Sequence, residues 1–320
     1  MEIAPGIHRI EAPLGERFVC LYLLIGSQRS LLVDTGLASM IGAVLAPYME
    51  SIGFDPTQLD YVLISHADFD HTGGAAAVRA LAPRAVFMCH EFDRLMIEDV
   101  ETIITQRYGQ YRADHGFDET GETKAFIRKE AQHIPIDLSV RGGEILHLGA
   151  GWRVEILHTP GHSRGHVSVY DPRSQTMIIL DAALWNAVLT KAGAPAFPPT
   201  YRYPETYRAT IQLLQSYPLE VLATSHYPLY RGAEPIAEFL GESAAYVDRV
   251  ERALRDALDR EQARTLLEVI AEISPKLGSW PQEANQYLIW SLTGHFEQMA
   301  NAGLIEVGRR GGIVTARWVG

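Results

Sequence analysis

Cysteine is scarce in this chain, with two among 320 residues, Cys20 and Cys89. One distant pair makes no disulfide framework, and Cys20 lies in the apolar run 18–23, where packing in a core is its expected role. No apolar stretch approaches the 18 residues that a membrane-spanning helix needs. The first residues also lack the basic start and apolar segment of a signal peptide. These absences predict a cytoplasmic protein that has no membrane partner.

An excess of positive charge is lacking as well. The chain has 28 Lys and Arg residues against 39 Asp and Glu residues, and its formal net charge at pH 7 is −11. A protein that binds nucleic acids mainly through their phosphates needs a basic surface, so the charge argues against that class of partner. A small anionic substrate is still compatible with this charge, because bound metal ions would dominate the local field.

Material for a buried core is ample, since hydrophobic residues make up 47% of the chain and charged residues 21%. The length predicts two domains, or one large domain with an appendage. Apolar runs of strand length alternate with segments of helical spacing, which predicts an α/β architecture. We expect strands at 18–25, 30–33, 59–64, 85–88, 143–148, 153–157, 166–170, 177–180 and 220–224, and helices at 38–53 and 75–81.

Two segments depart from this alternation. Residues 91–137 are polar and carry the spacing of helices, and we interpret them as an insertion that roofs a site. Residues 233–302 predict further helices, and 304–318 predict a hairpin that turns at Gly311 and Gly312. Helices followed by a glycine-tipped hairpin are typical of a winged helix. The predicted units are therefore a catalytic domain at 1–232 and a mainly helical, winged-helix-like domain at 233–320.

Seven histidine and aspartate side chains lie just after strand-like runs or in the turns that follow them. They are His66, Asp68, Asp70, His71, His162, Asp181 and His226. In an open α/β arrangement the carboxyl ends of strands converge on one edge, where ligands bind. The side chains at 66, 68 and 70 recur at every second residue while residue 71 points the other way, so one short loop can face two metal ions. Imidazoles and carboxylates suit zinc, iron or manganese without a thiolate.

Five motifs together resemble the metallo-β-lactamase superfamily over about residues 5–230. In order, they are Val33-Asp34-Thr35-Gly36, the HxDxDH segment from His66 to His71, Thr159-Pro160-Gly161-His162, the strand-end Asp181, and Ser225-His226. The resemblance implies a four-layer αβ/βα sandwich with two metal ions at one edge of its two sheets. The chain is similar to the lactamase-like-β-2 and hydroxyacylglutathione-hydrolase-like branches of that superfamily.

The same resemblance implies a role for each of these residues. One ion would be held by His66, Asp68 and His162, the other by Asp70, His71 and His226, with Asp181 bridging the two. Asp34 would support a ligand histidine by a hydrogen bond, and we expect His166 to support the site without touching a metal. Most members have histidine where this chain has Asp68. A hard carboxylate there shifts preference from zinc, the expected metal, towards iron or manganese.

Two metal ions about 3.5–4 Å apart share a water and lower its pKa towards neutrality. We therefore expect a hydrolase in which a bridging hydroxide attacks an ester, lactone, thioester or amide of a small molecule. Asp70 is the expected catalytic residue, because it ligates a metal and also orients the nucleophile.

Two other classes of function stay open. Lactamase-like endoribonucleases also carry a winged helix after the catalytic domain, which would make the chain a nuclease or phosphodiesterase acting on RNA or DNA. Residues 261–320 nevertheless hold five basic residues against six acidic ones, whereas a nucleic-acid-binding domain usually has an excess of basic residues on one face. We expect the C-terminal unit to serve in packing, as a lid or in a homodimer. The second class is a non-haem diiron redox protein, because flavodiiron members carry a glutamate at position 68; they also need a flavin domain, and none is visible after residue 230.

Overall fold

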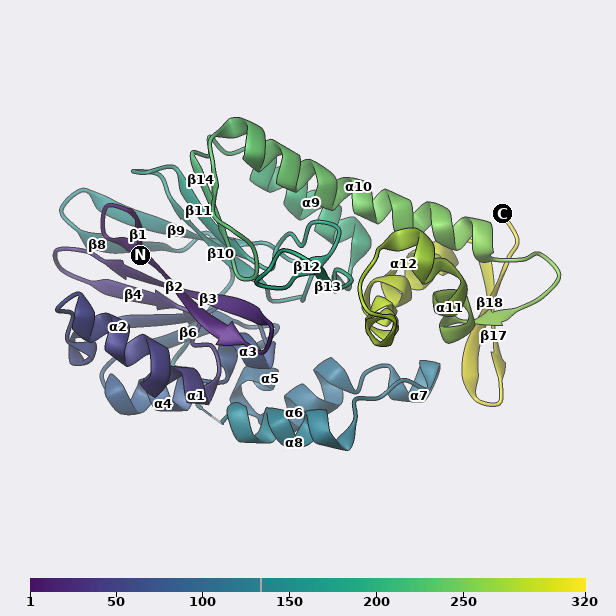
Figure 1. The fold of residues 1–320 in the computed structure, drawn as a ribbon, viewed down its shortest axis with the longest axis horizontal. Helices are drawn as coiled ribbons and strands as arrows, with labels where there is room; N and C mark the ends of the chain where they lie inside the picture. Colours follow the sequence, from purple (N-terminus) through teal and green to yellow (C-terminus); the bar gives the residue numbers. More distant parts are fainter. Residues whose placement is uncertain (133) are drawn as a thin grey trace.

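The computed structural model describes residues 1–132 and 134–320, and two β-sheets packed face to face occupy one end of the molecule (Figure 1). The first sheet has seven strands in the order β1-β2-β3-β4-β5-β6-β7, and the second has six in the order β15-β14-β11-β10-β9-β8. The strands of the first sheet are β1 Glu2–Ala4, β2 Ile7–Leu14, β3 Arg17–Ile25, β4 Ser30–Val33, β5 Tyr61–Ile64, β6 Val86–His90 and β7 Leu138–Val140. Those of the second are β8 Ile145–Gly149, β9 Trp152–His158, β10 Val167–Asp171, β11 Thr176–Leu180, β14 Val221–Thr224 and β15 Tyr230–Arg231.

The alternation of side chains along β3 explains why the first sheet is covered on both faces. Cys20, Tyr22 and Leu24 point into a core shared with strands of the second sheet. Leu21 and Leu23 point the other way and pack with the helices on the outer face. Because successive side chains of a strand face opposite ways, a strand that is apolar at every position is buried on both sides.

The second sheet follows the same rule. On β11, Ile178 and Leu180 join the core between the sheets, whereas Met177 and Ile179 pack against the helices outside. The helices of the first sheet are α1 Ala38–Met40, the π-turn η1 Ile41–Leu45, α2 Ala46–Ser51 and α4 Ala75–Leu81; those over the second are α9 Pro204–Gln215 and α10 Ala233–Ala257. Figure 1 shows these helix layers on the two outer sides of the paired sheets. The expected four-layer sandwich is confirmed.

The segment expected to be a helical insertion is helical. It contains α5 Arg94–Glu98, α6 Val100–Thr102, the π-turn η3 Ile103–Tyr108, α7 Arg112–His115 and α8 Gly121–Glu130. Val100, Ile103 and Ile104 belong to the same core as α9, α10 and the C-terminal helices, whereas Ile97 of α5 packs in the core outside the first sheet. Smaller elements are η2 Pro56–Gln58, α3 Phe69–Thr72, and the paired β12 Val188–Leu189 and β13 Pro195–Phe197.

Helix α10 runs from the sandwich to a C-terminal unit at the far end of the molecule (Figure 1). That unit consists of β16 Arg264–Thr265, α11 Leu266–Leu277, η4 Gln282–Leu288, α12 Ile289–Asn301, β17 Ile305–Arg310 and β18 Ile313–Trp318. The hairpin turns at Gly311 and Gly312, whose φ angles of +60° and +87° are accessible to glycine at little cost. The helical region and hairpin are as expected, while the winged-helix assignment and the domain bounds stay predictions. Across residues 1–132 and 134–320, the helices are too short or too polar to cross a membrane.

Candidate metal centre

The ends of parallel strands bring the chemical groups together. Strands β4 and β5 are parallel, as are β11 and β14, so within each sheet the carboxyl ends lie at one edge. The hydroxyl of Tyr22, on β3, donates to the carbonyl oxygen of Thr224 at the end of β14 at 2.6 Å, which joins the two sheets beside that edge. The segment after β5, the residue after β11 and the segment after β14 therefore meet there.

All seven residues expected as metal ligands lie at this edge. Their ligand atoms fall within 4.8 Å of one another in three overlapping groups, which are His66, Asp68 and His162; Asp70, His71 and His226; and His66, His71 and Asp181. The first two groups are the sets that the resemblance assigned to the two ions. Asp181 lies between them, with its Oδ2 3.5 Å from Nε2 of His226, 3.7 Å from that of His71 and 3.9 Å from that of His66.

Buried polar atoms without hydrogen-bond partners show that a metal ion fits these groups. Nε2 of His66, Nε2 of His71 and Oδ1 of Asp181 are all buried with no partner. Burying such atoms unpaired costs about 1–3 kcal/mol each. A cation bound at this edge would give such atoms a partner, and imidazole and carboxylate are suitable donors for zinc, iron or manganese.

The charges at the centre also favour a cation. Burial lowers the pKa of His71, but the carboxylates of Asp34, Asp70 and Asp181 outweigh burial and raise it to about 10. Burial together with the neighbouring His71 lowers the pKa of His66 to about 3. The carboxylates around His71 thus attract positive charge, which a divalent ion would supply, while His66 is held in the neutral form that binds metals.

Asp34 supports the loop of ligands after β5. Its carboxylate accepts from Nδ1 of His71 at 2.7 Å, from the Ser65 amide at 2.7 Å and from the Ser65 hydroxyl at 2.8 Å. The bond to Nδ1 leaves Nε2 of His71 directed at the centre. Asp34 is fully buried and has φ +62°, an angle at which aspartate and asparagine are tolerated.

His166 is engaged at both ring nitrogens. Its Nε2 accepts from the Asp181 amide at 3.2 Å, and its Nδ1 is 2.9 Å from the Thr159 hydroxyl. The ring stacks on that of His66 with centroids 5.0 Å apart. With both ring nitrogens engaged by protein atoms, His166 positions its neighbours. His226 is fixed in a similar way, because its Nδ1 donates to the Phe18 carbonyl oxygen at 2.8 Å.

Comparison with known proteins identifies the family. The family model described as the metallo-beta-lactamase superfamily matches residues 14–226. The chain belongs to the metallo-beta-lactamase superfamily. That superfamily consists mostly of hydrolases, which together with the candidate ligand groups supports a metal-dependent hydrolase.

Curated relatives of the chain in this superfamily are distant. It is 24% identical over 175 residues to the metallo-beta-lactamase fold-containing protein of Sulfurisphaera tokodaii (51% of this chain, 58% of the relative). It is 27% identical over 158 residues to a probable metallo-hydrolase of Bacillus subtilis (49% and 63%). A 53-residue stretch is 45% identical to the hydroxyacylglutathione hydrolase of Mesorhizobium japonicum (16% and 20%). The match spans less than two thirds of the length of each of these relatives.

Solved structures of the superfamily match nearly the whole chain. A metallo-beta-lactamase family protein from Thermus thermophilus superposes with a TM-score of 0.76 at 21% identity, covering 99% of this chain and 100% of that one. A beta-lactamase domain protein from Burkholderia ambifaria gives a TM-score of 0.77 at 16% identity, covering 100% and 93%. At these identities the likeness concerns the fold, including the region beyond the sandwich.

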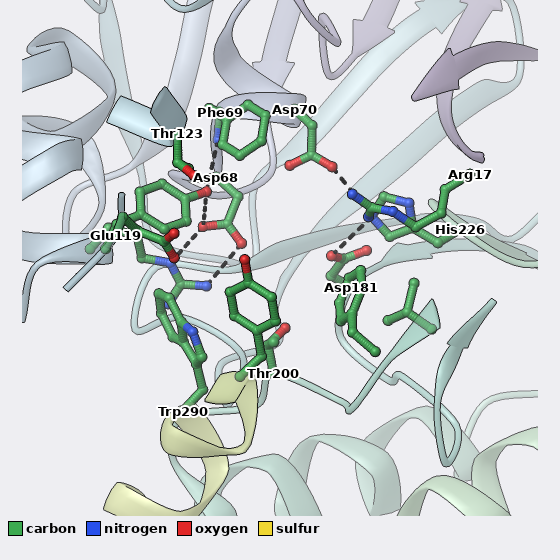
Figure 2. A pocket seen from close by; sticks show the side chains of 15 residues that line it. Arg17, Asp68, Phe69, Asp70, Glu119, Thr123, Asp181, Thr200, His226 and Trp290 are labelled. Carbon is green, nitrogen blue, oxygen red and sulfur yellow. Dashed lines mark hydrogen bonds and ion pairs between the residues drawn. The ribbon is translucent and has the colours of Figure 1, made fainter. Parts of the chain in front are cut away.

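A pocket of about 190 Å³ opens onto the centre of this superfamily member (Figure 2). Four of the seven residues line it, namely Asp68, Asp70, Asp181 and His226. Its walls carry five aromatic side chains: Phe69, Tyr108, Phe197, Tyr287 and Trp290. Tyr108 comes from the insertion, so the insertion roofs the site as expected, and Tyr287 and Trp290 come from the C-terminal unit.

The loop at 195–207 is rich in tyrosine, but it contributes Phe197 and Thr200 to the pocket. Tyr201 and Tyr207 are instead fully buried in the core. Their hydroxyls meet partners there, since that of Tyr207 accepts from the Leu184 amide and that of Tyr201 lies 3.0 Å from Nε2 of His295. A tyrosine whose hydroxyl is satisfied in this way buries its ring at little cost.

Two residues of the insertion were missed by the sequence analysis. Asp93 is fully buried and accepts from the Ser163 hydroxyl at 2.6 Å, the Gly165 amide at 2.8 Å and the Ala67 amide at 3.2 Å, which ties two ligand loops together. Arg107 lies on Asp68, with its Nε 2.6 Å from Oδ1 and its Nη2 3.0 Å from Oδ2. Burial opposes ionisation of Asp68, but the Arg107 guanidinium holds its pKa well below the usual range.

Proposed function

We propose that this chain is a metal-dependent hydrolase that cleaves an ester, lactone, thioester or amide bond of a small molecule bearing an apolar or aromatic group. The observation that carries the proposal is the pocket, in which Asp70, Asp181 and His226 of the candidate centre meet aromatic walls. A mainly apolar cavity with a few converging polar groups is typical of small-molecule sites. The short match to a hydroxyacylglutathione hydrolase favours a carbonyl compound.

Water is the nucleophile that the pocket favours. Neither a serine nor a cysteine is among the described residues that line it. Burial raises the pKa of the Cys20 thiol to about 12, and the Ser65 hydroxyl is engaged by Asp34. A divalent ion bound at the centre would supply a Lewis acid and make hydroxide available at neutral pH.

Asp70 is the residue best placed to orient that nucleophile. Its Oδ2 lies 3.6 Å from Nε2 of His226 and 3.9 Å from Nε2 of His71, and its side chain faces the pocket (Figure 2). A carboxylate in this position can ligate an ion through one oxygen and accept a hydrogen bond through the other. Arg17 lines the pocket beside His226, with its guanidinium carbon 4.7 Å from the centroid of the Phe197 ring, and offers a cation to an anionic group of the substrate.

The surface of the C-terminal unit supports a small-molecule substrate over a nucleic acid. Its hairpin arginines are paired with acids: Arg309 with Asp114 at 2.5 Å, Arg310 with Glu268, and Arg317 with Glu306. Cations neutralised in this way offer little to phosphates. We therefore propose no nucleic-acid partner.

The test combines a substrate panel with one substitution. Protein stripped of metal and reloaded with Zn²⁺, Fe²⁺ or Mn²⁺ is assayed against aryl ester, lactone, thioester, phosphodiester and β-lactam substrates. We expect turnover of at least one of the first three, and Asp70→Ala should lower kcat about a thousandfold or more. Asp55→Ala is the matched control, because Asp55 caps the short helix η2 away from the centre and should leave turnover unchanged. Turnover of the phosphodiester alone, or unchanged kcat in Asp70→Ala, would contradict the proposal.

A further inference from the structure

The first group of candidate ligands contains a cationic side chain. Nη2 of Arg107 lies 2.9 Å from Nε2 of His162 and 3.0 Å from Oδ2 of Asp68. Nη1 of Arg107 also donates to the main-chain oxygen of His162 at 3.2 Å. Only 5% of the Arg107 side chain is exposed, so the contact lies inside the protein.

These contacts use the atoms that a metal ion would need. Nε2 of His162 has room for one partner, and it already lies 2.8 Å from Oδ2 of Asp68 and 2.9 Å from Nη2 of Arg107, so protein groups occupy the place of a metal. The two parallel bonds from Arg107 to Asp68 neutralise the one carboxylate of this group. A divalent ion here would have to displace the guanidinium, or stand in a buried site beside it, where repulsion between cations is strong.

The second group carries no such competitor. Within the described residues, the ion pairs of Asp70 and Asp181 are made with histidines alone. Two carboxylates therefore share this group with His71 and His226. It is thus richer in negative charge than the group at Asp68 and keeps its donor atoms available.

Arg107 is held in position by the C-terminal unit. Its guanidinium carbon lies 4.3 Å from the centroid of the Trp290 ring, on α12, which is a cation–π contact. The Gln110 side chain donates to the Arg107 main-chain oxygen at 2.6 Å, and the Tyr108 hydroxyl donates to the same Asp68 carboxylate at 3.2 Å. The cation is therefore fixed on both sides.

We propose that Arg107 replaces one metal ion in this member of the superfamily. The chain binds one divalent ion tightly through Asp70, His71, Asp181 and His226, and the guanidinium keeps the group at Asp68 free of metal while supplying a fixed positive charge beside the pocket. This revises the expectation of two ions. It rests on the metal dependence proposed above, but not on the substrate.

Metal stoichiometry tests the proposal without reference to activity. Protein stripped with a chelator is titrated with Zn²⁺ by calorimetry, and bound zinc is measured by elemental analysis after dialysis. We expect one equivalent for the wild type. Arg107→Met removes the charge while keeping an apolar chain against Trp290, and should bind two equivalents, the second at least tenfold more tightly than in the wild type. Arg79→Met is the matched control, because Arg79 also lies over an aromatic ring, Phe87 at 4.1 Å, and pairs with an aspartate, Asp137 at 2.9 Å, away from the centre.

A second variant keeps the proposal testable if Arg107→Met fails to fold. Asp68→Asn removes a carboxylate that a two-metal centre would need, yet it should leave the single tight equivalent unchanged. Two equivalents of similar affinity in the wild type, one equivalent in folded Arg107→Met, or loss of a tight equivalent in Asp68→Asn would each overturn the proposal. No bound zinc in any protein would instead overturn the proposed function itself.

Discussion

At the scale of single residues, Asp34 decides which nitrogen of His71 faces the centre. Asp34→Asn should keep the backbone, since asparagine tolerates the +62° φ angle of this position. Its amide nitrogen would meet Nδ1–H of His71, so that two donors face each other and the other tautomer, with the proton on Nε2, becomes favoured. We expect the dissociation constant for Zn²⁺ to rise about 10–100-fold. Competition with a chromogenic chelator measures it.

The control for this substitution is Asp60→Asn. Asp60 accepts from the Ser30 amide at 2.9 Å and from Arg29 at 2.7 Å, at the opposite end of β5 from the ligands. That variant should bind zinc as the wild type does. Equal zinc affinity in the wild type and Asp34→Asn would show that the bond to Nδ1 does not set the strength of the centre.

The residues that sequence reasoning found and missed differ in where their partners lie. His66, Asp181 and His226 were predicted because each follows an apolar strand, and parallel strand ends meet at one edge whatever the loops do. Arg107 was missed because its partners, Asp68, His162 and Trp290, come from three separate parts of the chain. A polar helical segment gives no signal of the burial of one of its arginines.

At the scale of elements, continuous apolar runs were the strongest signal. The strand expected at 30–33 has those bounds in the structure, and that expected at 18–25 extends by one residue to Arg17. The expected helix at 38–53 spans Ala38–Ser51, with a π-turn at Ile41–Leu45 that keeps the spacing nearly helical. The strand Leu138–Val140 and the pair β12–β13 were missed, because two or three residues are too few to show a period.

Helix α12 contains a buried histidine, His295, that makes the free energy of unfolding depend on pH. His295 is buried against the Tyr201 hydroxyl, and burial, with a smaller effect of Arg208, lowers its pKa to about 3. Below about pH 6.5 the unfolded chain takes up a proton at His295 while the folded protein does not. The free energy of unfolding should therefore fall as the pH falls from 6.5 towards 3, by up to about 1.4 kcal/mol per pH unit from this group.

His295→Gln keeps a polar partner for Tyr201 but cannot take up that proton. Its free energy of unfolding should depend less steeply on pH between 6.5 and 5 than that of the wild type, as measured by urea denaturation at several pH values. His147→Gln, at an exposed position on β8, is the control and should follow the wild type. Parallel curves for His295→Gln and the wild type would contradict this account of the buried imidazole.

At the scale of the whole molecule, the C-terminal unit completes the pocket. Arg202, in the loop before α9, makes two bonds with Glu297 of α12, at 2.6 and 2.8 Å. The same helix brings Trp290 to the pocket, and the neighbouring turn η4 brings Tyr287. The sequence predicted helices with buried faces here, but not which surface they cover, because an apolar stripe specifies burial and not its partner.

The hairpin arginines of this unit decide whether it can also bind nucleic acid. Replacing Arg309 and Arg310 together by glutamine removes the hairpin cations that a winged helix would place near phosphates. Because both are already paired with acids, we expect hydrolysis of a small ester or lactone to stay within about twofold of the wild type. Titration with duplex DNA and RNA should show no binding tighter than about micromolar at physiological salt, for either protein.

The matched control replaces Arg84 and Arg153, two exposed arginines outside the hairpin, by glutamine. A nucleic-acid-binding winged helix would bind with a dissociation constant below micromolar, and its affinity would fall steeply as the salt concentration rises. Replacing the hairpin arginines would abolish that binding, whereas replacing the control pair would not. That result would favour the nuclease over the small-molecule hydrolase. We expect equally weak binding by all three proteins, because the hairpin arginines are already paired with acids. A cation neutralised within the fold releases few counterions when a polyanion binds.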